Sequence, residues 1–179
     1  MKKILASLVF AVFGLALLSA RDEAPRKIPL PENYREWVYL SSGLGMSYTA
    51  NAKPDDDPDF DNVFTEPAAY AEFKKTGTWP DKTMLILEVR KAQSHSSINT
   101  SGHFQSDVEG IEAHVKDQRM AGKWAFYSFG TGKSGTLIPT SASCYSCHEQ
   151  HGVVDTTFVQ FYPTLLKIAQ DKGTVENKR

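Results

Sequence analysis

The sequence predicts a mainly β fold of the α+β class, in which a strand-rich core carries a few short helices. Several short runs of Val, Ile, Leu and aromatic residues, bounded by turn-forming residues, are typical of strands. The helical patterns are short, and neither a heptad pattern nor an internal repeat is present. The chain has 179 residues, which suffices for one domain with a substantial core but hardly for two.

The first 20 residues have the pattern of a secretory signal peptide. Lys2 and Lys3 form a positive start, residues 4–18 are apolar, and Ser19-Ala20 offers a small-residue cleavage site. The apolar run is too short to predict a membrane span. Leu18, the third residue before the cut, is not ideal for cleavage, so an uncleaved N-terminal anchor remains an alternative.

The expected organisation is an exported, periplasmic protein with one folded domain. Its parts are a signal peptide over residues 1–20, a polar leader over 21–30 and the domain over 31–179. The chain carries 20 Lys and Arg against 21 Asp and Glu, and loss of the signal peptide would remove two of the lysines. A nucleic-acid partner would need a basic face, so this composition argues against one.

The domain is predicted to open with a short helix over 31–37. Pro31 stands in its first turn, where the missing N–H costs nothing. Tyr34, Trp37 and Val38 would share one face, as in a packed amphipathic helix. An extended stretch over 38–40 and a turn rich in Gly and Ser over 41–45 are expected to follow.

An acidic segment comes next. Four alternating aspartates and a glutamate at the twelfth position imitate a calcium loop: Asp55, Asp57, Asp59, Asp61 and Glu66. Phe60, however, stands where such a loop needs glycine, and Pro58 stiffens the segment. The sequence therefore favours a solvated acidic loop over a cation site.

The clearest helix is predicted over 67–76. It has proline at its start, Ala, Glu and Lys within, and Gly77 just past its end. Residues 83–89 are almost wholly apolar and predict a buried strand. Glu88 interrupts that strand, so it needs either a partner or a function.

The second half of the chain is predicted as strands followed by short helices. Residues 124–129 carry aromatic side chains on both faces, which favours a central strand. The other segments are a loop over 91–102, a strand over 108–115, a glycine-rich loop over 131–136, a short helix over 140–151 capped by Thr140 or Ser141, and a last element that Asp155 caps and Pro163 interrupts.

The most specific motif is Cys144-Tyr-Ser-Cys147-His148, a C-x-x-C-H run. This pattern is the attachment signature of a c-type haem. Two cysteines on one helical turn can each form a thioether with a haem vinyl group, and the adjacent histidine can then ligate the iron. We therefore predict one covalent haem c, held by Cys144 and Cys147, with His148 as the axial iron ligand.

Other readings of the motif are a redox pair, half a zinc site or a disulfide. No βαβ pattern precedes it, which disfavours a redox pair. The chain has only 2 cysteines, so a four-cysteine zinc site is excluded, although one completed by histidines is not. Export favours haem, because c-type attachment occurs outside the cytoplasm.

A sixth iron ligand would decide what the haem can do. Iron with one imidazole and no second strong ligand can bind a diatomic molecule. The Met and His residues that offer a sixth ligand are Met46, Met84, Met120, His95, His103, His114 and His151. Each is better explained as a surface or core residue, so we predict five-coordinate iron.

Several stretches together resemble the cytochrome P-460 family. They run in order over 31–37, 67–88, 110–117, 124–127, the haem motif and 158–163. The resemblance implies a mainly antiparallel β fold and a homodimer. It also implies a single haem whose proximal ligand is the motif histidine and whose distal face is vacant or holds water.

That family has two branches. Cytochromes P-460 proper carry a lysine linked to the porphyrin and oxidise hydroxylamine to nitrous oxide, whereas cytochromes c′-beta lack the link and bind NO and CO in an apolar pocket. The linking lysine should stand immediately before Glu88, where this chain has Leu87. Neither Lys82 nor Lys91 can take its place without a shift that the neighbouring residues forbid. Glu112 matches the distal carboxylate of the hydroxylamine-oxidising branch.

The expected function is therefore a periplasmic haem protein with an apolar distal pocket at Leu87 that binds NO, CO or a similar gas. The alternative is a hydroxylamine or NO oxidoreductase in which Glu112 relays protons and a redox partner protein takes the electrons. Glu112 could instead simply pair with Lys116 or Arg90. Electron transfer is a second alternative, and it would need six-coordinate iron.

Overall fold

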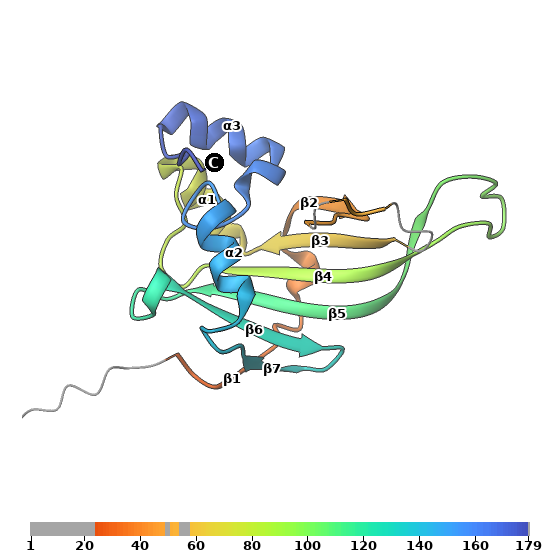
Figure 1. Ribbon diagram of the computed structural model, residues 1–179, viewed down its shortest axis with the longest axis horizontal. Coiled ribbons are helices and arrows are strands. Elements are labelled where there is room, and N and C mark those ends of the chain that lie inside the picture. The colour runs from red at the N-terminus through yellow and green to blue at the C-terminus, as the bar shows by residue number, and fades with distance from the viewer. Residues whose placement is uncertain (1–23, 49–50, 54–57, 179) are drawn as a thin grey trace, which may run out of the picture.

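The structure is a computed structural model that describes residues 24–48, 51–53 and 58–178. Within these residues, seven strands form one antiparallel sheet in the order β1-β7-β6-β5-β4-β3-β2 (Figure 1). The strands are β1 (Lys27–Pro29), β2 (Val38–Leu44), β3 (Asp59–Thr65), β4 (Met84–Gln93), β5 (Phe104–Lys116), β6 (Trp124–Gly130) and β7 (Ser134–Leu137). This architecture confirms the predicted fold class.

Helices are few and short. They are α1 (Pro67–Thr76), α2 (Ser143–His151) and α3 (Pro163–Lys172), with single 3-10 turns η1 (Tyr34–Glu36), η2 (Ala121–Lys123) and η3 (Val159–Phe161). The helix α2 lies across one face of the sheet, and α1 and α3 pack together beside it (Figure 1). No helix among the described residues is both long and apolar enough to span a membrane. The predicted signal peptide lies outside the described residues.

Alternation along the strands gives the sheet two apolar faces. On one face, Phe126 of β6 packs in a cluster with Phe73 of α1 and Leu165 of α3. The other face is covered by the N-terminal segment, where Tyr34 packs in a cluster with Ile86. β6 supplies aromatic residues to both clusters, as expected of a central strand: Trp124 and Phe126 to the first, Tyr127 and Phe129 to the second.

The strongest sequence patterns give the right elements. The predicted strands over 83–89, 108–115 and 124–129 are confirmed as β4, β5 and β6, each somewhat longer than expected. The predicted helix over 67–76 is α1, and Gly77 ends it with a φ of 77°. Glycine suits this position because it adopts the left-handed conformation without steric cost.

Other elements differ from prediction because sheet pairing overrides local propensity. Residues 41–44, expected in a turn, continue β2 and pair with β3. The predicted helix over 31–37 is only the single turn η1. At the far edge, β7 arises within a predicted loop and pairs with β1, which belongs to the expected leader. Asp155 caps no helix, because α3 begins only at Pro163.

Candidate functional site

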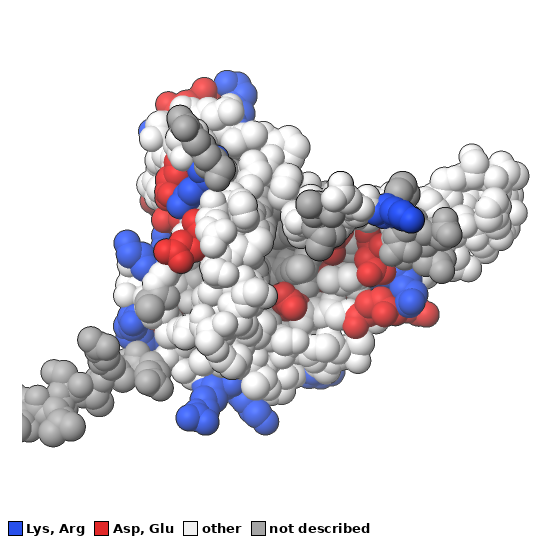
Figure 2. All heavy atoms as spheres, viewed as in Figure 1, with Lys and Arg blue, Asp and Glu red and all other residues white. Residues whose placement is uncertain are grey.

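A cavity of about 470 Å³ lies between the sheet, α2 and the segment around η3. Strands β2 to β5 supply one wall, and α2 and residues 157–162 supply the other. Figure 2 shows a hollow in this face of the molecule with an acidic side chain at its edge. Most of the lining is apolar, which suits a large apolar group rather than a sugar or a nucleotide.

The sheet presents its cavity-lining side chains in rows. The pairing places Leu85 beside His114 in the first row and Leu87 beside Glu112 in the second. Asp61 of β3 belongs to a third row. Successive rows lie about 7 Å apart, because side chains on one face of a strand are two residues apart. All five residues line the cavity.

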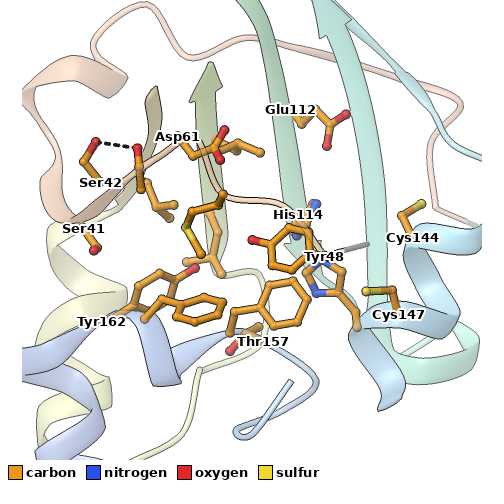
Figure 3. A pocket seen from close by; sticks show the side chains of 18 residues that line it. Ser41, Ser42, Tyr48, Asp61, Glu112, His114, Cys144, Cys147, Thr157 and Tyr162 are labelled. Carbon is orange, nitrogen blue, oxygen red and sulfur yellow. Dashed lines mark hydrogen bonds between the residues drawn. The ribbon is translucent and has the colours of Figure 1, made fainter. Parts of the chain in front are cut away.

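The helix α2 brings Cys144, Cys147 and His148 to the cavity. Figure 3 shows the two cysteines on one side of the cavity, Ser41 and Ser42 on the other, and side chains of β5 between them. Both thiols are free, so neither cysteine forms a disulfide. The residue before the first turn of α2 is Ala142, so the predicted caps, Thr140 and Ser141, are wrong.

Tyr145, between the two cysteines, fixes α2 to the sheet. Its hydroxyl accepts a hydrogen bond from the backbone N–H of Phe126 (3.0 Å) and donates one to the carbonyl of Ile138 (3.2 Å). Its ring stacks on Phe126 with the centroids 4.2 Å apart. These contacts set the position of the helix, and therefore of both thiols, against the cavity.

His148 is held in one orientation by aromatic rings and one hydrogen bond. Its ring centroid lies 4.3 Å from that of Phe158, 4.7 Å from His114 and 4.8 Å from Phe126. Its Nδ1 lies 2.9 Å from the carbonyl oxygen of Thr156. Burial lowers the pKa of His148, which favours the neutral ring. A neutral ring that donates from Nδ1 leaves Nε2 available to a metal.

Glu112 faces the cavity and makes no hydrogen bond or ion pair with the other described residues. Burial raises its pKa, and the nearby Asp61 raises it further. The partners considered from sequence are engaged elsewhere: Lys116 with Asp155, and Arg90 with Glu88. The simple ion-pair explanation of Glu112 is therefore wrong.

Asp61 is a cavity residue that the sequence did not reveal. It was expected in a solvated acidic loop, but it stands on β3 and lines the cavity. Burial raises its pKa, and Asp59 raises it further. Asp55 and Asp57 lie outside the described residues, and the part of the chain that is described holds no group of three or more His, Cys, Asp or Glu side chains that could bind a metal ion.

Among the possible sixth ligands, only Met46 and His114 line this cavity. Met84 and Met120 pack on the opposite face of the sheet, His151 lines a neighbouring pocket, and His95 and His103 lie in the β4–β5 connection. The Met46 side chain folds back over Gly43, where an added Cβ would lie 2.2 Å from the Met46 sulfur. Met46 is thus the methionine that the site could use.

The fold and the cavity define a protein built to hold a haem. A mostly apolar cavity has two free thiols and an imidazole with an available Nε2 on one wall, which are the groups that c-type attachment requires.

The family model described as cytochrome P-460 matches residues 31–159. The chain belongs to that family, and it is a haem c cytochrome of the family. No curated protein matched the chain.

Proposed function

We propose that this cytochrome binds NO or a similar small neutral gas at five-coordinate haem iron, without catalysing a reaction. The observation that carries the proposal is the position of Leu87, an apolar residue on the cavity wall where the hydroxylamine-oxidising branch has its lysine. Export to the periplasm through residues 1–20 and assembly as a homodimer are part of the same proposal.

The α2 segment would hold the single haem. The S–H bonds of Cys144 and Cys147 would add across the two vinyl groups and so give two thioethers. His148 would ligate the iron through Nε2, because its Nδ1–H donates to the carbonyl of Thr156. When bound, the haem supplies an iron that accepts a diatomic ligand on its open side.

The second row of the cavity would select the ligand. Leu87 and its neighbour Val63 present only carbon and hydrogen. An anion entering this space would lose its hydration and gain no hydrogen bond from either residue. A neutral diatomic gas needs no such bond, so the apolar wall favours NO and CO.

An oxidoreductase that acts on hydroxylamine or NO is the second candidate, and Glu112 favours it. This carboxyl lies beside Leu87, lacks a partner among the described residues and has a pKa raised by burial. Such a group keeps its proton to a higher pH than a free carboxyl does, and it can pass that proton to or from a bound molecule. Oxidation of hydroxylamine to nitrous oxide and water releases protons and electrons in equal number, so Glu112 would take protons and a redox partner protein would take electrons.

Absorption spectra and turnover of the purified protein separate the two candidates. Gas binding predicts an intact mass increased by one haem, an ordinary c-type Soret band, a spectral change with NO or CO, and no hydroxylamine oxidation with an artificial acceptor. A red-shifted ferrous band, or turnover that Glu112→Ala abolishes, would establish the oxidoreductase instead. Glu109→Ala is the matched control, because Glu109 is exposed on the same strand and pairs with Lys91.

A further inference from the structure

The turn that follows α2 has an unusual backbone. Thr157 donates its N–H to the carbonyl of Val154 (2.8 Å), and the two residues between them have positive φ values, 49° at Asp155 and 58° at Thr156. Such turns ordinarily carry Asn, Asp or Gly at the first of these positions and Gly at the second, so Asp155 is ordinary and Thr156 is not. A β-branched threonine with positive φ is a genuine outlier, which persists only where its surroundings enforce it.

A partly buried ion pair holds Asp155, the first of these two residues. Lys116, only 5% exposed, places its Nζ 2.8 Å from Oδ2 of Asp155 and 2.6 Å from the carbonyl oxygen of Trp79. The same Asp155 oxygen accepts the backbone N–H of Trp79 at 3.0 Å. The indole N–H of Trp79 also donates to Oγ1 of Thr157 at 3.0 Å. Asp155 is therefore tied to β5 through Lys116, and both Asp155 and Thr157 are tied to Trp79 in the α1–β4 connection.

Thr156, the second of these two residues, packs against Gly152 at the end of α2. A Cβ on Gly152 would lie 2.2 Å from the carbonyl carbon of Thr156 and 2.4 Å from its oxygen, so only glycine lets that peptide group approach so closely. The same carbonyl oxygen is the acceptor for Nδ1 of His148, at 2.9 Å. The turn thus aims one carbonyl at one histidine.

We propose that Lys116 and Asp155 are positioning residues for the axial histidine, which they serve by holding the turn so that the Thr156 carbonyl accepts the Nδ1–H of His148. The inference rests on the proposed role of His148 as iron ligand. A hydrogen bond at Nδ1 fixes the ring and makes Nε2 a more basic ligand. A more basic ligand strengthens the iron–histidine bond and stabilises ferric over ferrous iron.

The test uses the haem-loaded protein with Lys116→Met and Asp155→Ala. Two readouts report on the histidine: the iron–histidine stretching frequency of the ferrous protein by resonance Raman, and the midpoint potential. In both variants the frequency should shift down and the potential up. Asp155→Asn keeps a hydrogen-bond acceptor and tolerates positive φ, so it should shift both readouts in the same direction by less.

A stability control separates positioning from folding. Glu88 anchors a buried network on the opposite face of the sheet, so Glu88→Gln should lower stability and leave both readouts unchanged. The proposal is overturned if correctly loaded Lys116→Met and Asp155→Ala keep the frequency and potential of the unmodified protein. If either variant fails to fold, the proposal is overturned by an Asp155→Asn protein whose frequency and midpoint potential equal those of the unmodified protein. Absence of an iron–histidine band from the unmodified protein would instead refute His148 as the ligand.

Discussion

Leu87 of β4 and Glu112 of β5 lie directly opposite each other in the sheet, and both side chains line the cavity. One residue offers only an apolar surface and the other an ionisable group, within the same stretch of wall. Under the proposed function, ligand choice would depend on which of the two side chains reaches the bound molecule. Substitution of Leu87 tests its effect on ligand affinity, and substitution of Glu112 tests the cost of burying its charge.

Leu87→Gln should make the ferric protein bind azide about tenfold more tightly. A hydrogen bond from the new amide to the charged azide is worth about 1.5 kcal/mol, which corresponds to a factor of about ten in affinity. CO binding to the ferrous protein should change little, because a neutral gas does not depend on the donor. Spectroscopic titration measures both affinities. Leu87→Met controls for shape, and equal azide affinity in all three proteins would contradict an apolar filter.

Glu112→Gln should stabilise the protein at about pH 7 and lose that advantage near pH 4. Burial raises the pKa of Glu112 above its ordinary value of 4.5, so the folded state binds the proton more tightly than the unfolded state. The stability that this group contributes is greatest at low pH and falls as the pH rises through the raised pKa. Urea unfolding of the haem-loaded protein at the two pH values measures the difference.

The exposed Glu109 again gives the control for Glu112. Glu109→Gln removes the same charge from the same strand, but at an exposed position. Its effect on stability should be small at both pH values. A Glu112→Gln variant less stable than the parent at neutral pH would show that the carboxylate is stabilised by contacts that outweigh its burial.

The sequence predicted what local patterns determine and missed what only tertiary contacts determine. The apolar run over 83–89 predicts a strand from a few adjacent residues. The motif at Cys144–His148 likewise predicts a short helix from local pattern alone. Asp61 was missed because composition cannot say which face of a strand a residue occupies. The turn at Thr156 was missed because it lacks glycine and is held from Trp79, which lies far away in the sequence.

Glu88→Ala should lower the free energy of unfolding by about 2 kcal/mol, because it leaves the buried Tyr34 hydroxyl without its acceptor and removes the ion pairs with the more exposed Arg35 and Arg90. Glu88 accepts hydrogen bonds from the Tyr34 hydroxyl, from Nε of Arg35 at 2.8 Å and from Nε of Arg90 at 2.5 Å. It lies on the face of the sheet away from the cavity, so the absorption spectrum and gas affinity should not change. Urea unfolding followed by fluorescence measures the loss, and an altered Soret band would contradict this separation of the two faces.

Met46 distinguishes gas binding from electron transfer. With five-coordinate iron, Met46→Ala should leave the ferric absorption spectrum unchanged and raise the rate of CO association several-fold, because it opens the cavity wall over Gly43. If the Met46 thioether were instead the sixth ligand, the unmodified ferric protein would show the weak far-red band of sulfur-ligated haem, and the substitution would abolish it. Flash photolysis measures the rate, and Met84→Ala is the control, since Met84 packs on the other face of the sheet. A far-red band that disappears only in Met46→Ala would favour an electron-transfer cytochrome over a gas-binding one.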